Sequence, residues 1–177
     1  MKKKSTQWRE RDLDNKLMEC ILAPQPELST IQDLVDRGAD VNSTNSFGES
    51  VLMDALCSRG DDLPVSVVKL LIEIGADIHY RDEEGHSALS FACYAYRPDV
   101  VELLLNEGAD PNVVSEDESL LDYVQFDAVN IARECARGAQ GMPREERMRL
   151  EDQARRSEAI ISLLVAAGAK HTDELMD

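Results

Sequence analysis

The sequence has few aromatic residues, few basic residues and no long apolar run. Aromatic residues make up 5% of the 177 residues and hydrophobic residues 43%, which is typical of one folded domain with an aliphatic core. Lysine and arginine number 19 against 35 aspartate and glutamate residues, for a net charge of −16. Because such a surface repels phosphate, we expect no nucleic acid partner. The acidity favours a basic protein partner, or serves only solubility.

The sequence also lacks the motifs of known catalytic sites and the residue spacing of known metal sites. No histidine lies near a cysteine at metal-ligand spacing, and no nucleophile-elbow, zinc-protease or Walker sequence occurs. The acidic stretches 61–62 and 82–84 lack the spacing of a calcium loop and are expected to be solvated turns. We therefore expect no enzyme activity, no catalytic residue, no cofactor and no metal.

Cysteine usage and hydropathy bear on location. The four cysteines contain no Cys-x-x-Cys pair, and we expect them to be buried reduced thiols: Cys20, Cys57, Cys93 and Cys135. The basic start MKKK is not followed by an apolar segment, so it does not form a signal peptide, and no segment is suited to span a membrane. A cytoplasmic location is expected, with export by a route that needs no signal as the alternative.

A ten-residue pattern occurs four times along the chain. The copies are DLVDRGADVN at 33–42, LLIEIGADIH at 70–79, LLLNEGADPN at 103–112 and LLVAAGAKHT at 163–172. Each has a leucine four residues before a glycine, and an alanine follows the glycine. Glycine suits the left-handed conformation that ends a helix, and the leucines before it form a buried stripe. Each copy therefore predicts the end of a helix.

A second motif precedes two of these copies. The stretches GESVLMDA at 48–55 and GHSALSFA at 85–92 resemble the G-x-T-P-L-H-x-A turn and first helix of ankyrin repeats, and the spacing of 33 residues between Gly75 and Gly108 matches that family. Ser50 and Ser87 stand where threonine caps the helix. The usual proline is absent from both stretches. Met53 or Ser90 replaces the usual histidine, so we expect an unchanged fold of reduced stability.

The resemblance to ankyrin repeats implies an all-α solenoid of about four helix-turn-helix repeats joined by short turn fingers. The resemblance covers about residues 13–124 and 157–172. The chain as a whole is similar to stand-alone ankyrin proteins of the bacterial type. The expected repeats are about 13–45, 46–82, 83–115 and 116–172, within one domain at 13–172. Residues 1–12 and 173–177 are expected to be tails.

The last repeat contains an insertion at about 125–156. The distance from the first-helix leucine to the helix-ending glycine is 19 residues in repeat 3 (Leu89 to Gly108) but 47 in repeat 4 (Leu121 to Gly168). Apolar residues continue at helical spacing on both sides of a turn near Gly138 and Pro143. We therefore predict that both helices are lengthened by about 14 residues each and form a hairpin projecting by roughly 20 Å. A disordered loop is the alternative.

Charge differs between the insertion and the repeats. Residues 125–156 contain seven arginines and six acidic residues, so the hairpin is nearly neutral. Residues 12–124 contain 24 acidic and six basic residues. The arginines of the insertion are spaced to pair with acids one helical turn away, which favours a structural role over phosphate binding.

Ankyrin proteins are protein-binding scaffolds, so the resemblance implies a non-enzymatic module whose concave face, formed by fingers and first helices, contacts the partner. Tyrosines among carboxylates on that face suit a basic partner. The alternative is that Tyr94 and Tyr96 only pack between repeats. The predicted binding residues are Phe47, Glu49, Met53, Asp54, Tyr80, Asp82, Glu83, Glu84, Ser90, Tyr94, Tyr96, Glu116, Asp117, Glu118, Asp122 and Tyr123.

Three roles fit these expectations. The first is a stoichiometric inhibitor of a basic protein, for example an immunity protein that blocks a nuclease toxin. The second is an adaptor or secreted effector that recruits other proteins. The third is a structural or regulatory subunit that self-associates through the hairpin of repeat 4. We expect a monomer or a weak homodimer.

Overall fold

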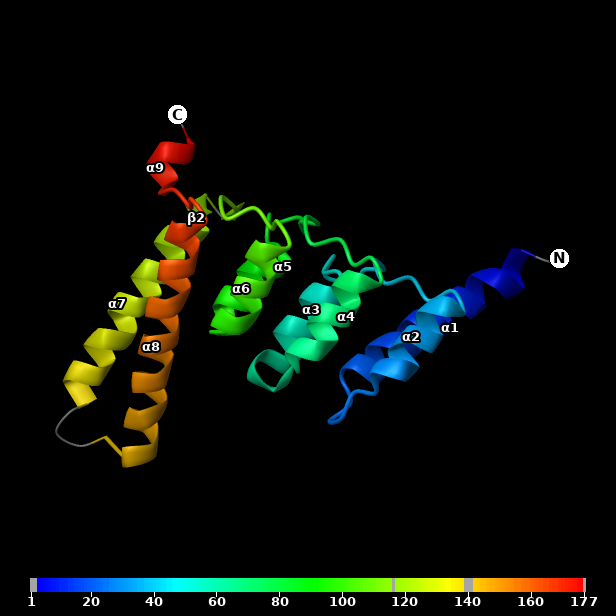
Figure 1. Cartoon of the computed structure of the whole chain (residues 1–177), viewed down its shortest axis with the longest axis horizontal. Coiled ribbons are helices and arrows are strands. Elements are labelled where there is room, and N and C mark those ends of the chain that lie inside the picture. The colour runs from blue at the N-terminus through cyan, green and yellow to red at the C-terminus, as the bar shows by residue number, and fades with distance from the viewer. Residues whose placement is uncertain (1–2, 116, 139–141, 177) are drawn as a thin grey trace.

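The computed structural model describes residues 3–115, 117–138 and 142–176. In these residues four helix pairs stand side by side in chain order, so that the N-terminal and C-terminal ends of the chain lie at opposite ends of the array (Figure 1). The connections between successive pairs run along one edge of the array and form the fingers. This arrangement confirms the predicted all-α solenoid of about four repeats.

Each pair contains a first and a second helix. The first helices are α1 (Lys3–Ile21), α3 (Val51–Arg59), α5 (Ala88–Tyr94) and α7 (Leu120–Gly138). The second helices are α2 (Leu28–Asp36), α4 (Val65–Glu73), α6 (Pro98–Asn106) and α8 (Arg144–Ala166). The remaining elements are the 3-10 helix η1 (Gly60–Asp62), the antiparallel strands β1 (Val114–Ser115) and β2 (Glu118–Ser119), and helix α9 (Thr172–Leu175). Residues 3–12, which the repeat pattern assigns to a tail, continue helix α1, and α9 occupies most of the predicted C-terminal tail.

The core lies between the two layers of helices. One leucine from each first helix and one from each second helix are at most 5% exposed: Leu17, Leu52, Leu89, Leu121, Leu34, Leu71, Leu104 and Leu164. Burying such a side chain contributes about 1.5–3 kcal/mol each. The repeated leucines therefore form one continuous apolar layer, as the sequence pattern predicts.

The predicted helix boundaries are present. The hydroxyl oxygens of Ser50 and Ser87 accept hydrogen bonds from the backbone N–H groups of Met53 and Ser90, which caps α3 and α5. Just after the C-terminal end of α4, Gly75 has a φ of 99°, a left-handed conformation that favours glycine. Both ends of these helices thus follow from residues visible in the sequence.

The position of the usual ankyrin histidine is filled in three different ways. Met53 is completely buried in the core. Ser90 forms a reciprocal capping box with Ser87, and Asp122 accepts hydrogen bonds from Ser119 and Thr172. The position is therefore apolar at Met53 and hydrogen-bonded at Ser90 and Asp122, and the reduced stability expected from the replaced histidine stays a prediction.

Asparagine side chains connect adjacent repeats at the base of the fingers. Asn42 donates from Nδ2 to the carbonyl oxygen of Gly75 (3.0 Å), and its Oδ1 accepts from the N–H of Asp77 (2.8 Å). Asn112 accepts from the N–H of Lys170 (2.9 Å). His79 occupies the same position in repeat 2 and makes no such bridge among the described contacts. The junction between repeats 2 and 3 thus differs from its neighbours.

Arginine side chains connect the repeats at the opposite end of the helices. Arg59 donates to the carbonyl oxygen of Leu22 in the repeat before it (3.0 Å). Arg97, only 5% exposed, donates in the same way to Gly60 (2.7 Å) and Leu63 (2.9 Å). These contacts satisfy carbonyl groups in the turns between first and second helices. No sequence pattern identified them in advance.

Repeat 4 has the predicted long hairpin. Helix α7 has 19 residues and α8 has 23, against 9 in α4 and in α6. Ser157, Ile160 and Leu164 of α8 are buried against the array, whereas residues 144–149 are exposed. The distal ends of α7 and α8 extend beyond α5 and α6 (Figure 1). In its described residues, 125–138 and 142–156, the insertion is therefore a projecting helical hairpin and not one disordered loop.

Two further expectations concern thiols and membranes. All four cysteines are free, and Cys93 is buried, but Cys57 is exposed on α3, so the expectation of uniformly buried thiols is wrong at that residue. In the described part of the chain, no helix combines the length and the apolar character needed to cross a bilayer.

Candidate protein-binding face

The fingers and the neighbouring sides of α1, α3, α5 and α7 form one continuous face, called here the finger face (Figure 1). Two fingers close in the same way. In the first, Asn45 Oδ1 accepts from the N–H groups of Phe47 and Glu49. In the second, Asp82 Oδ1 accepts from the N–H groups of Glu84 and His86. A short polar side chain four residues before the end of the turn therefore determines the shape of each finger.

The finger tips carry the most exposed of the predicted binding residues. Phe47 at the first tip is 77% exposed, and Glu83 and Glu84 are exposed at the second. Asp117 and Glu118 are exposed at the third, where Asp117 adopts a positive φ of 65°. Glu116 lies outside the described residues. An aromatic ring and acidic side chains thus follow one another along the fingers.

Two predicted binding residues are wrong because they lie in the core. Met53 and Ser90 are both 0% exposed, so neither can contact a partner without unfolding its helix. Both occupy the histidine position of the motif, three residues after the helix cap. This position turns inward as the helix starts, which the motif alone did not reveal.

Other predicted residues have polar groups that already serve the fold. The side chain of Asp82 is only 3% exposed and closes its finger. The hydroxyl group of Tyr80 donates to the carbonyl oxygen of Gly48 (2.8 Å), which joins the first and second fingers. Asp122 binds the residues that follow α8. For Asp82 and Asp122 in particular, contact with a partner would compete with these internal hydrogen bonds.

Tyr96 does not lie in a first helix, because α5 ends at Tyr94. It adopts a positive φ of 52° in the turn to α6, at the end of the helices away from the fingers. Its hydroxyl group donates to Asp127 of α7 (2.6 Å), and burial together with this carboxylate raises the pKa of Tyr96. Tyr96 therefore packs between repeats 3 and 4, as the alternative interpretation held.

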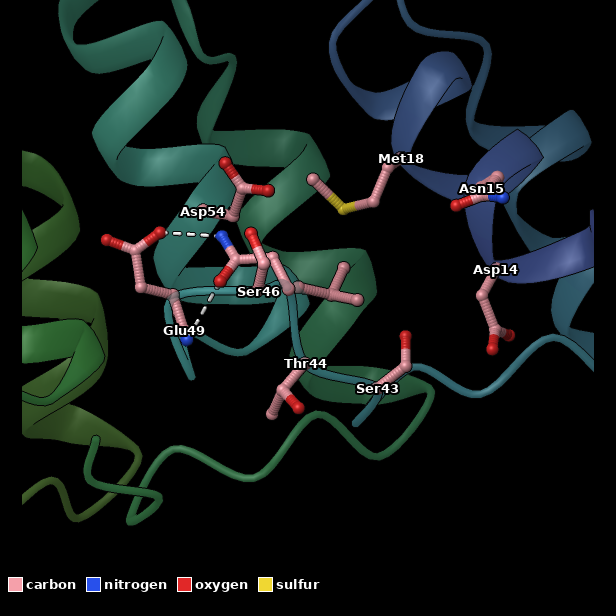
Figure 2. Close-up of a pocket in the computed structure, with 10 residues that line it drawn as sticks. Asp14, Asn15, Met18, Ser43, Thr44, Ser46, Glu49 and Asp54 are labelled. Carbon is pink, nitrogen blue, oxygen red and sulfur yellow. Dashed lines mark hydrogen bonds between the residues drawn. The ribbon is translucent and has the colours of Figure 1, made fainter. Parts of the chain in front are cut away.

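A hollow with a volume of about 680 Å³ lies on the finger face between repeats 1 and 2. Figure 2 shows Met18 of α1 reaching toward α3 across this hollow, with Glu49 and Asp54 on the opposite side. Its lining residues are Asp14, Asn15, Met18, Ser43, Thr44, Asn45, Ser46, Glu49, Val51 and Asp54. We call it the acidic hollow, because three carboxylates line it.

The acidic hollow combines two predicted residues with several that sequence reasoning missed. Glu49 and Asp54 are among the predicted binding residues, whereas Asp14 and Met18 are not. Asp14 lies three residues before Leu17, as Glu49 lies three residues before Leu52. Aligning repeat 1 with repeat 2 on these leucines would therefore have identified Asp14. Its Oδ1 also accepts from the N–H of Asp40 (2.7 Å), which fixes its position.

The electrostatic effect of the acidic hollow reaches the neighbouring thiol. The pKa of Cys57 is raised by partial burial and by the carboxylates of Glu49 and Asp54. A negative potential raises the pKa of a thiol because it disfavours the thiolate. The same potential attracts cationic groups to this part of the finger face.

One cluster on the second finger has the composition of a metal site. Asp82, Glu84 and His86 place one ligand atom each within 4.8 Å of one another. His86 Nδ1 lies 3.2 Å from Asp82 Oδ2, and Asp82 Oδ1 accepts backbone hydrogen bonds, so the cluster is accounted for by closure of the finger. We assign no metal to it, and a metal-free turn stays a prediction.

Comparison with known proteins agrees with this architecture. A family model for ankyrin repeats in three copies matches residues 17–115, more than half of the chain. Human protein phosphatase 1 regulatory subunit 27 is 45% identical over 84 residues, and its mouse counterpart is 34% identical over the same length. An ankyrin repeat protein of Acanthamoeba polyphaga mimivirus is 28% identical over 126 residues, 69% of this chain and 73% of that protein.

The two phosphatase regulatory subunits are matched over 48% of this chain and 52% of their own length. The chain therefore spans about half of these relatives, and the likeness concerns the repeats. Three matched repeats, the capped first helices and the helix-ending glycines all lead to one conclusion: the chain belongs to the ankyrin repeat family.

Proposed function

We propose that this protein is a non-catalytic binding module whose acidic finger face holds a basic segment of a protein partner. The observation that carries the proposal is the acidic hollow, where Asp14, Glu49 and Asp54 surround a space of about 680 Å³. Glu83, Glu84 and Glu118 extend the acidic character along the fingers. A face of one charge accelerates association with a partner of opposite charge and suppresses wrong partners.

The family and the names of the relatives support a binding role. Ankyrin repeats are protein-interaction modules, and a regulatory subunit of a phosphatase acts through binding to another protein. Inhibition of a basic protein is one form of the proposed role, of which immunity against a toxin is a special case. Recruitment as an adaptor or effector is another form. Both use the same face and differ only in what the partner does.

The proposal is tested by charge reversal with a matched control. Glu83→Lys with Glu84→Lys changes the second finger, and Glu102→Lys with Glu158→Lys makes the same charge change on the second helices α6 and α8. All four side chains are exposed, so folding should be retained. Asp82 is left unchanged because it closes the finger.

The partner is captured from the cells that produce the protein, eluted with a salt gradient and identified by mass spectrometry. Its association rate is then measured with the purified protein. We expect the finger variant to associate several times more slowly, with weaker salt dependence, and the control variant to match the native chain. Equal rates for both variants would refute binding through the finger face.

A second candidate function is self-association through the hairpin. Two apolar side chains of α7 are unusually exposed, Phe126 at 62% and Val129 at 48%. Light scattering on the full chain tests this role directly, and deletion of residues 127–154 should convert an oligomer into a monomer. A native chain that is already monomeric at high concentration removes this candidate.

A further inference from the structure

A second pocket lies on the finger face between repeats 3 and 4. Its volume is about 220 Å³, and it is lined by His86, Tyr94, Ser115, Glu118 and Tyr123. The residues come from the second finger, helix α5, the strands of the third finger and helix α7. We call it the tyrosine pocket. It is separate from the acidic hollow, and no residue lines both.

Two tyrosine rings from adjacent repeats form a corner of the tyrosine pocket. The ring centroids of Tyr94 and Tyr123 lie 4.6 Å apart at an interplanar angle of 64°. The ring of His86 stands nearly perpendicular to Tyr94, with centroids 5.8 Å apart. The hydroxyl oxygen of Tyr94 is also 3.5 Å from Ser115 Oγ. These contacts hold the rings in position without a ligand, so little order has to be gained on binding.

Carboxylates make the tyrosine pocket electronegative. Glu118 lines it and is exposed, and Asp127 lies one helical turn after Tyr123 on α7. The pKa of Tyr123 is raised by burial and by the negative charges of Asp127 and Glu118. An anion such as phosphate would be repelled here. A purely apolar side chain would contact the rings but would gain no charge attraction from the carboxylate.

We propose that the tyrosine pocket seats one basic side chain, lysine or arginine, of the protein partner. The inference rests on the proposed function, because it assumes that the partner lies along the finger face. The cation would contact the ring faces of Tyr94 and Tyr123 and pair with the carboxylate of Glu118. Aromatic rings attract cations through their quadrupole, and an adjacent carboxylate adds direct charge attraction.

The test uses small probes, so it does not depend on identifying the partner. Backbone amide shifts of the full chain are followed by NMR during titration with N-acetyl-arginine amide, N-acetyl-lysine amide and the neutral N-acetyl-citrulline amide. We expect saturable shifts at Ser115, Glu118 and Tyr123 with both cations, with dissociation constants in the millimolar range. Citrulline has nearly the shape of arginine without its charge, and it should bind at least fivefold more weakly.

Variants separate the two parts of the recognition. Glu118→Gln should weaken binding of both cations at least threefold, and Tyr123→Ala should do the same. Tyr123→Phe keeps the ring and should stay within twofold of the native chain. Val165→Ala, at an exposed position of helix α8 outside the predicted binding residues, is the control and should change nothing. Tyr123 is 37% exposed, and an unchanged thermal midpoint shows that its variants fold.

The outcomes distinguish this inference from the proposed function. Equal binding of citrulline and arginine, or unchanged binding in Glu118→Gln and Tyr123→Ala, overturns the tyrosine pocket as a cation site. Cation-dependent shifts confined to the acidic hollow also overturn it, but they leave binding through the finger face intact. The proposed function itself falls only if the captured partner is insensitive to charge reversal on the fingers.

Discussion

Arg97 donates from Nη1 to the carbonyl oxygen of Gly60, 2.7 Å away in the preceding repeat, although the two residues are 37 positions apart in the chain. The same guanidinium group binds Leu63 and the carboxylate of Asp99. The hydrogen bond from Arg97 and the charge of its guanidinium group lower the pKa of Asp99 despite the partial burial of this carboxylate. Arg97 therefore holds the turn of repeat 2, including η1, against repeat 3.

Arg97→Met should destabilise the fold by about 2–3 kcal/mol, because the buried carbonyl group of Leu63 and the partly buried one of Gly60 lose a charged donor. Urea unfolding followed by circular dichroism measures this. Arg81→Met is the matched control, since Arg81 forms an exposed ion pair with Asp110, and it should cost less than about 1 kcal/mol. Equal effects of the two substitutions would contradict the assigned role of Arg97.

His79→Asn should stabilise the array by about 1 kcal/mol, the usual net value of a new hydrogen bond. Asn42 in the preceding repeat shows the expected geometry, with bonds to Gly75 and Asp77. The new asparagine should reach the equivalent groups, the carbonyl oxygen of Gly108 and the N–H of Asp110. Thermal unfolding measures the gain, and Asn42→Ala should show a comparable loss. A lower midpoint for His79→Asn would show that His79 itself stabilises its junction.

The contact of His171 with Asp122 should make the C-terminal segment pH-dependent. His171 Nδ1 lies 2.5 Å from Asp122 Oδ1, and this hydrogen bond raises the pKa of His171 above its ordinary value of 6.5. Because the pKa is raised, the stability that protonated His171 contributes is fully present below pH 6.5 and is lost as pH rises through the folded-state pKa. Docking of α9 should therefore weaken in alkaline solution.

The opposite sign applies to Asp122. Burial alone would raise its pKa, but hydrogen bonds from His171, Thr172 and Ser119 lower it well below its ordinary value of 3.8. Its contribution is present above pH 3.8 and is lost in stronger acid. NMR titration of His171 in the native chain and in Asp122→Asn provides the test. An unchanged His171 pKa in the variant would disprove the coupling.

The thiols should differ in reactivity because of their surroundings. Cys57 is exposed but its pKa is raised, so at pH 8 it should react with iodoacetamide more slowly than a cysteine in an unfolded peptide. Cys93 is buried, which also raises its pKa, and should react only on unfolding. Glu49→Gln should accelerate the reaction of Cys57. Mass spectrometry of partly labelled protein measures the rates of Cys57 and Cys93 in the native chain and of Cys57 in Glu49→Gln. An unchanged rate of Cys57 in Glu49→Gln would exclude an electrostatic cause.

Most of the secondary structure could be predicted from local sequence. The helix-ending glycines, the serine caps and the buried leucines depend on the chemistry of single residues and on helical spacing. The hairpin was also predictable, because apolar residues continue at helical spacing through α7 and α8. The binding residues were predicted less well. Exposed residues at the finger tips were identified, but Met53 and Ser90 turn inward and Asp82 closes its own finger.

By itself, the sequence determined that this protein is an acidic ankyrin-repeat array with a long last hairpin, because repeats, caps and charge are local properties of the chain. Only the tertiary structure decided which carboxylates share the acidic hollow, and that Tyr94 and Tyr123 meet in one pocket. These pairings cross from one repeat to the next. They depend on how neighbouring helix pairs stack, which involves residues about one repeat apart in sequence and therefore leaves no local signal.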